Sequence, residues 1–200
     1  MIYKTRNVEL FWQNKITECY CKNNLVFVSI FKNASTFYKN VFINNKWNVL
    51  EFKDINWEVN HVFGFIQDPV VRYCKGLTED LHKDLDLSRK IIPILSDNCS
   101  VLTFHTVPIS IIVGDRMYDM TWFPLDLDTS SKQQLDEFCN QHGISLNWNL
   151  DYVTHSSDSE KINFFNNMKF LLGDGNHIFW RLFAKDIDLY NNVVHNHKKL

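Results

Sequence analysis

The stretch LVFVSIFKNASTFYKNVF, from Leu25 to Phe42, decides the fold. Its apolar run, rich in β-branched and aromatic side chains, predicts a buried strand over 25–31. The hydroxyl side chains and the apolar spacing that follow predict a helix over 35–44. The turn between them places Lys32 at a helix N-terminus, where backbone N–H groups and the helix dipole bind anions. This stretch therefore predicts a cradle for a phosphate or sulfate group that requires no metal ion.

The turn differs from the Walker A loop, the nearest familiar phosphate-binding pattern. It contains no glycine, and Lys32 precedes Ala34 and the hydroxyls of Ser35 and Thr36. We therefore expect a shorter loop that holds one terminal phosphate against the helix. The missing glycines disfavour a P-loop-like nucleotide kinase. A capped amphipathic helix that follows a core strand and binds no ligand would also explain the pattern.

The spacing Lys-x-Ala-Ser-Thr after a hydrophobic strand resembles the 5′-phosphosulfate-binding motif of sulfotransferases. These enzymes use 3′-phosphoadenosine 5′-phosphosulfate (PAPS) as donor and release 3′,5′-bisphosphoadenosine (PAP), without a metal. The resemblance implies that the lysine neutralises the leaving oxygen and that the turn holds the 5′ end of the donor. The cofactor-binding residues implied here are Lys32, Asn33, Ala34, Ser35, Thr36 and Phe37.

A second segment, HVFGFIQDPVVRYCK from His61 to Lys75, repeats the arrangement of strand, turn and helix. Its apolar start predicts a strand over 61–66, and the residues after the turn predict a helix over 69–83. Asp68 is suited to cap a helix whose first residue is Pro69.

This segment resembles the sulfotransferase 3′-phosphate-binding motif, Arg-Asp-Pro-x-x-Arg-x-x-Ser. Asp68, Pro69 and Arg72 match the motif in register. Gln67 stands where the family has an arginine, and Lys75 stands where it has the serine that touches the phosphate. The resemblance implies that Arg72 and Lys75 bind the 3′-phosphate, with Lys75 returning a point charge that Gln67 lacks. A weakened or altered nucleotide site remains an alternative.

Two later segments are similar to parts of the carbohydrate sulfotransferase branch. His105 opens a His-x-x-Pro segment, and Asp186 opens an Asp-x-x-Leu-Tyr segment near the end of the chain. The order of all four segments implies one domain over 1–200, with an α/β, P-loop-like, three-layer fold. Its central sheet is expected to be mainly parallel and flanked by helices. The other expected elements are a strand over 48–53, a helix over 87–96, a strand or loop over 100–105, a helix over 108–114, a strand over 120–124, a helix over 130–142 and helices near 160–172, 175–183 and 186–195.

Composition bears on the partners, the compartment and the metal content that we expect for this chain. The 200 residues carry a formal charge of −2, so no footprint for nucleic acid is visible. No signal peptide or apolar stretch of about 18 residues is present, which predicts a protein of the cytoplasm without a membrane partner. An odd number of cysteines without a Cys-x-x-Cys pair indicates a reducing compartment. The histidines show no recurring ligand spacing, so no metal site is expected.

The implied reaction moves a sulfuryl group from PAPS to a hydroxyl or amine by in-line displacement. A hydroxyl acceptor needs a general base within hydrogen-bond reach. Glu51 is the first candidate, because the family commonly draws its base from this strand and Glu51 shares a strand face with Lys53. A solvent-facing edge charge explains Glu51 equally well. His105 is the second candidate, with a structural histidine as its alternative, and Glu79 and His82 are expected at the acceptor entrance.

Three functional classes follow. The first is a small sulfotransferase whose acceptor is a carbohydrate, a lipid, a peptide tyrosine or a small phenol. The second is a catalytically inactive nucleotide-binding module on the same scaffold, for which Gln67 is the main argument. The third is the P-loop-like kinase, which would require ATP and magnesium.

Overall fold

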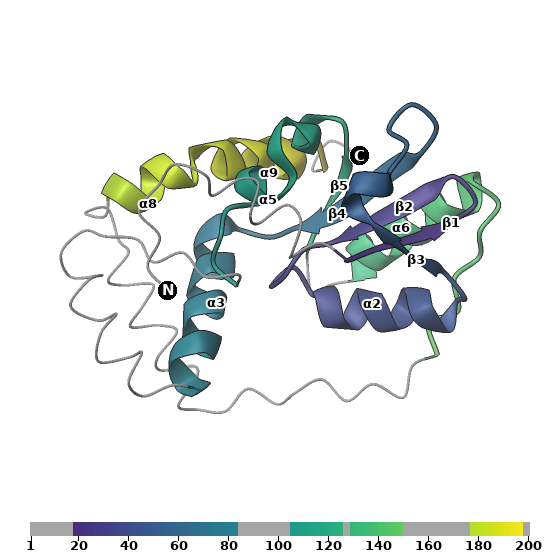
Figure 1. Cartoon of the computed structure of the whole chain (residues 1–200), viewed down its shortest axis with the longest axis horizontal. Coiled ribbons are helices and arrows are strands. Elements are labelled where there is room, and N and C mark those ends of the chain that lie inside the picture. The colour runs from purple at the N-terminus through teal and green to yellow at the C-terminus, as the bar shows by residue number, and fades with distance from the viewer. Residues whose placement is uncertain (1–17, 84–104, 126–128, 150–176, 198–200) are drawn as a thin grey trace.

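The computed structural model describes residues 18–83, 105–125, 129–149 and 177–197 (Figure 1). The helices expected over 87–96 and 160–172 lie outside the described residues. The same holds for all but the last residue of the expected strand or loop over 100–105.

A five-stranded sheet occupies the centre, in the order β3-β1-β2-β4-β5. β1 pairs antiparallel with β2 and with β3, whereas β2 pairs parallel with β4 and β4 pairs parallel with β5. The four strands other than β1 therefore run in one direction, yet half of the pairings are antiparallel. The α/β class is confirmed, and the sheet is mixed rather than mainly parallel. The strands are β1 (Glu18–Lys22), β2 (Leu25–Ser29), β3 (Asn48–Glu51), β4 (His61–Ile66) and β5 (Thr121–Pro124).

Helices cover both faces of the sheet, because successive strand side chains point to opposite sides. Phe27 of β2 points toward α2 (Ser35–Asn44) and α6 (Thr129–Gln141), in a cluster built largely of aromatic rings. Val26 and Val28 point the other way, into an aliphatic cluster with α5 (Ile109–Val113) and α9 (Ala184–His197). The result is three layers, two of helices and one of strands (Figure 1).

The remaining helix α3 (Pro69–Lys83) runs from the end of β4, and its Tyr73 ring lies 5.0 Å from the ring of Phe179 in α8 (His177–Leu182). Two short 3₁₀ segments, η1 (Phe52–Asp54) and η2 (Gly114–Tyr118), complete the described elements. Within the described ranges, no helix is long and apolar enough to cross a lipid bilayer.

The direction of the connections places the site. The chain leaves β2 through α2 toward β3, at one edge of the sheet. It leaves β4 through α3 toward β5, at the opposite edge. The carboxyl ends of the adjacent strands β2 and β4 therefore flank a topological switch point. Open α/β sheets bind ligands in the crevice at such a point.

Candidate functional site

The turn after β2 has an unusual backbone for a stretch without glycine. Lys32 and Ala34 both have left-handed conformations, with φ of 63° and 52°. Such a conformation costs an L-residue roughly 1–2 kcal/mol. The α2 helix begins directly after this turn, and none of the described side chains caps its N-terminus. The fold thus holds a strained turn next to uncapped helical N–H groups.

Asn33, at the centre of this turn, is buried without side-chain hydrogen bonds. Its side chain is 2% exposed, and neither amide atom has a partner among the described residues. A buried polar group in this state costs about 1–3 kcal/mol. An anion at this helix N-terminus could accept a hydrogen bond from Nδ2, whereas Oδ1 would require a donor.

The turn after β4, by contrast, makes its own hydrogen bonds. The Asp68 carboxylate accepts the backbone N–H groups of Val70 and Val71, at 2.8 and 3.1 Å, and caps α3. Gln67 joins the two turns, because its Nε2 donates to the carbonyl oxygen of Lys32 and its Oε1 accepts from Lys75 Nζ at 3.1 Å. Where the sulfotransferase motif has an arginine, this chain has an amide that supports the neighbouring turn.

Arg72 lies inside the protein instead of at the surface of a nucleotide site. It is 0% exposed, its Nε donates to the Phe31 carbonyl at 3.2 Å, and its Nη1 donates to the Val107 carbonyl at 2.7 Å. Burial lowers the pKa of Arg72 to about 10, although the charge of Asp186 opposes this shift. Arg72 therefore ties the Lys32 turn to the segment before α5, and only its Nη2 has no partner among the described residues.

Asp186 of α9 secures the other end of that segment. Its carboxylate accepts the backbone N–H groups of Ile109 and Ser110, at 2.6 and 2.9 Å, at the start of α5. Burial raises the pKa of Asp186, while Arg72 and these two hydrogen bonds oppose the rise. The His-x-x-Pro and Asp-x-x-Leu-Tyr segments are thus joined in space.

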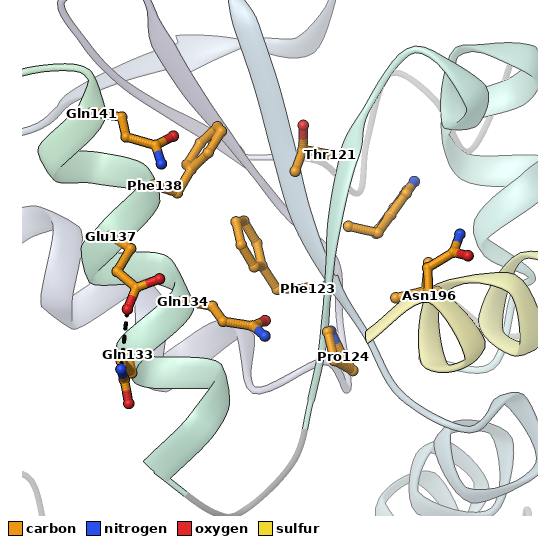
Figure 2. A pocket seen from close by; sticks show the side chains of 11 residues that line it. Thr121, Phe123, Pro124, Gln133, Gln134, Glu137, Phe138, Gln141 and Asn196 are labelled. Carbon is orange, nitrogen blue, oxygen red and sulfur yellow. Dashed lines mark hydrogen bonds between the residues drawn. The ribbon is translucent and has the colours of Figure 1, made fainter. Parts of the chain in front are cut away.

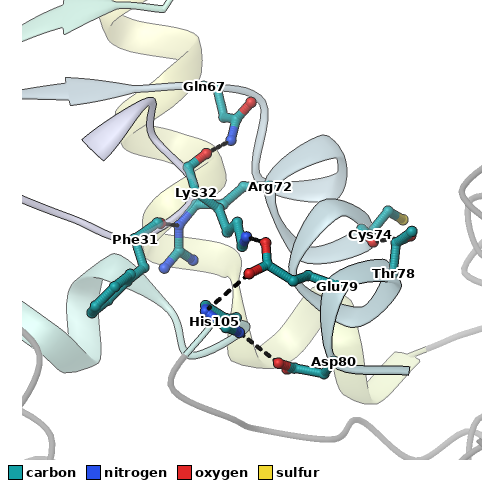
Figure 3. Close-up of polar contacts among 9 residues, drawn as sticks. All are labelled: Phe31, Lys32, Gln67, Arg72, Cys74, Thr78, Glu79, Asp80 and His105. Carbon is teal, nitrogen blue, oxygen red and sulfur yellow. Dashed lines mark hydrogen bonds and ion pairs between the residues drawn. The ribbon is translucent and has the colours of Figure 1, made fainter. Parts of the chain in front are cut away.

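Four charged or titratable side chains meet beyond the carboxyl ends of β2 and β4 (Figure 3). Lys32 Nζ forms an ion pair with Glu79 of α3. The other Glu79 oxygen lies 3.9 Å from His105 Nε2, and His105 Nδ1 lies 2.5 Å from Asp80 Oδ1. The Phe31 ring packs edge-on against the imidazole, with 5.7 Å between ring centres. The cluster combines an anion-binding ammonium group with an imidazole that a carboxylate orients.

The structure brings three of the sequence-predicted residues together, namely Lys32, His105 and Glu79. Asp80 was not among the residues predicted from the sequence. A usable signal was the four-residue spacing of Arg72, Gly76 and Asp80, which places them on one face of α3. That face contacts the segment that carries His105.

Glu51 lies elsewhere. It ends β3, an outer strand of the described sheet, and its exposed carboxylate pairs with Lys53 Nζ at 2.7 Å. Through Glu18 of β1 it aligns with Ser29, two strands away, or about 10 Å across the sheet. No described contact joins Glu51 to the Lys32 cluster.

The other expected binding residues line the start of α2 and the surface of α3. Ser35 is half-buried and Thr36 is exposed. The half-buried Phe37 ring stacks near that of Trp148, with 6.4 Å between centres. Lys75 is exposed at the surface, although desolvation of its ammonium group lowers its pKa. The His82 side chain lies outside the described residues.

A hollow of about 680 Å³ runs along β5, the strand at the edge of the described sheet farthest from β3 (Figure 2). Phe123 and Phe138 line it beside α6, and Asn196 of α9 lines its opposite side. None of the sequence-predicted site residues borders this hollow. We therefore place the candidate site at the Lys32 cluster, where charge, buried polar atoms and topology coincide. Within the described ranges, the Lys32 cluster included, no three His, Cys, Asp or Glu side chains are grouped to hold a metal ion.

Comparison with known proteins gives no relative, since no family model, curated protein or solved structure matches the chain.

Proposed function

We propose that this chain is a sulfotransferase on a P-loop-like, three-layer scaffold. It would move a sulfuryl group from PAPS to a hydroxyl or amine of an acceptor, with a carbohydrate among the candidates. The observation that carries the proposal is the turn after β2. There Lys32, the start of α2 and the buried amide of Asn33 together fit the 5′ end of such a donor, since within the described ranges the helix start has no side-chain cap and the amide has no partner.

The donor supplies an activated sulfuryl group, and the residues of this chain supply charge, position and a proton acceptor. Lys32 stabilises the electron pair left on the bridging oxygen as the bond from sulfur to that oxygen breaks. Nε2 of His105 accepts the proton of the acceptor hydroxyl as the new bond from oxygen to sulfur forms. The Lys32 ammonium group has three N–H donors, so it can contact the donor while it stays paired with Glu79.

Binding of the 3′-phosphate would fall to Lys75. It is exposed, follows the Asp-Pro turn by two helical turns and already contacts Gln67. Arg72 fits this role less well because its guanidinium is enclosed by protein and bound to two carbonyl groups. Its part in the proposal is to hold the Lys32 turn and the His105 segment at a fixed separation.

The enclosure of Arg72 also favours a second candidate, a nucleotide-binding module without transferase activity. The kinase alternative gains nothing comparable from the described residues. For either candidate we propose a cytoplasmic setting, since the described cysteines carry free thiols, as a reducing compartment would require.

Thermal unfolding with PAP, compared with ATP plus magnesium, tests the proposal. A ligand at about 100 times its Kd adds roughly 2.7 kcal/mol to the free energy of unfolding. For a chain of this length the midpoint should rise by several degrees. We expect PAP alone to produce the shift and Lys32→Ala to reduce it. Lys46→Ala is the matched control, because Lys46 is an exposed lysine with φ of 59° at the other end of α2.

The outcomes separate the candidates. Equal PAP shifts in wild type, Lys32→Ala and Lys46→Ala would move the nucleotide site away from this turn. No shift at saturating PAP would reject the sulfotransferase, and a shift with ATP plus magnesium alone would favour a kinase. A PAP shift without sulfuryl transfer to any hydroxyl or amine acceptor would favour the binding module.

A further inference from the structure

We propose that Asp80 is the positioning residue of His105, holding its imidazole so that Nε2 faces the acceptor. The inference rests on the proposed function for its chemical meaning. Its structural content, the tautomer and orientation of one imidazole, can be measured independently of any activity.

The contacts of the imidazole define the tautomer. His105 is 8% exposed, and its Nδ1 lies 2.5 Å from the Asp80 carboxylate oxygen. An ionised carboxylate only accepts hydrogen bonds, so in the neutral imidazole the proton resides on Nδ1. Nε2 is then the ring nitrogen that carries the lone pair and can accept a proton. Nε2 is directed toward the Lys32–Glu79 pair, with Glu79 at 3.9 Å, beyond hydrogen-bond distance.

The fold holds the His105 backbone against the helix that carries Asp80. At Gly76, a Cβ atom would lie 2.5 Å from the His105 carbonyl oxygen and 2.9 Å from the Thr106 methyl group. Only glycine permits this approach. One turn earlier on α3, Arg72 donates to the Val107 carbonyl. Thus three residues on one face of α3, spaced by four, fix the backbone of the segment and the side chain of its histidine.

A contact with an aromatic ring also restrains the imidazole. The Phe31 ring meets it edge-on at an angle of 81°, and Phe31 directly precedes Lys32. The base and the anion-binding lysine are therefore positioned by neighbouring parts of one packed unit. An imidazole restrained on both sides loses little further entropy when an acceptor binds, which is the condition for efficient proton transfer.

Asp80→Asn tests the proposal with a readout that a merely structural role would not move. The asparagine side chain can donate to Nδ1 through its amide, which stabilises the other tautomer, with the proton on Nε2. We would record proton–nitrogen correlation spectra of the histidine rings at about pH 8.5, where an ordinary imidazole is neutral. Wild type is expected to show Nδ1–H at His105, and Asp80→Asn is expected to gain Nε2–H.

In the transfer assay, Asp80→Asn should lower kcat at least about 10-fold, because the altered tautomer places the proton on Nε2 and removes the general base. The KM for the acceptor and the PAP-induced thermal shift should stay unchanged. Asp188→Asn is the matched control, an exposed aspartate on α9, and should alter neither tautomer nor kcat. Asp80→Ala provides a second variant if Asp80→Asn does not fold.

Nε2–H at His105 in wild type, or a tautomer that both Asp80 variants leave unchanged, would overturn the proposal. An unchanged kcat in a variant with the altered tautomer would overturn the catalytic part of it. If no transfer occurs with any acceptor while the tautomer shifts as expected, the proposed function fails and the positioning by Asp80 stands.

Discussion

The two turns at the carboxyl ends of β2 and β4 lie side by side and are built in opposite ways. The turn after β4 uses Asp68 to cap its helix and Pro69 at the first helical position, where no N–H is needed. The turn after β2 has two left-handed residues, and among the described residues its helix has no side-chain cap and its buried amide has no partner. One turn satisfies its own polar groups, and the other leaves polar groups without partners among the described residues.

The difference shows which of the two turns lowers the stability of the fold. Residues of the β4 side hold the β2 turn in its costly conformation, since Gln67 bonds the Lys32 carbonyl and Arg72 bonds the Phe31 carbonyl. Strain of this kind persists only where the surrounding structure enforces it, and it concentrates at functional sites. The satisfied turn thus supports the unsatisfied one.

The largest expected effect comes from Asn33→Leu. Leucine removes two buried polar atoms that have no partner among the described residues, so the free energy of unfolding should rise by about 1–3 kcal/mol. The same substitution should abolish the gain in the free energy of unfolding that PAP causes. Urea unfolding with and without PAP measures both effects in one experiment.

Asn44→Leu serves as the control for this change. Asn44 is an exposed amide at the end of α2, and its replacement should alter stability by no more than about 0.5 kcal/mol. If Asn33→Leu instead destabilises the protein and leaves the PAP shift intact, Asn33 is a packing residue and the contrast between the turns is lost.

A smaller effect of opposite sign is expected for Asp68→Ala. The variant loses the cap of α3, which should lower the free energy of unfolding by about 1 kcal/mol. Asp68→Asn keeps an oxygen acceptor, so its free energy of unfolding should fall by only a few tenths of a kcal/mol. Neither variant should change the PAP shift, because Asp68 serves its own helix. A lost PAP shift in Asp68→Asn would assign the β4 turn to the ligand site as well.

Local sequence signals predicted most elements near the site. The helices expected over 35–44 and 69–83 are α2 and α3, and the strand expected over 61–66 is β4. The strand β1 was missed because its five residues carry little apolar periodicity. The Asn23–Asn24 turn, with Asn23 at φ of 54°, was the available hairpin signal. Without β1, the sheet was expected to be mainly parallel.

The candidate site was predicted only in part, and the physical reason is a different one. The place of Lys32 in the candidate site could be predicted from the local sequence of its turn. The burial of Arg72 and the pairing of Asp80 with His105 depend on contacts between distant segments. Motif spacing specifies which residues are present, and tertiary packing decides which of them face a ligand. Arg72 was assigned to the phosphate because a sequence pattern carries no information on burial of its guanidinium.

The smallest effect, from Ala34→Gly, measures the strain of the β2 turn directly. At φ of 52° and ψ of 29°, glycine removes the clash of the Cβ atom but adds backbone entropy to the unfolded chain. The net gain in the free energy of unfolding should be below about 1 kcal/mol. Gly143→Ala makes the reciprocal change at φ of 71°, where no other atom lies within 4 Å of the added Cβ, so it reports the left-handed strain alone. A loss of stability in Ala34→Gly, beside the expected loss in Gly143→Ala, would show that the β2 turn does not store strain and that only the amide of Asn33 distinguishes it.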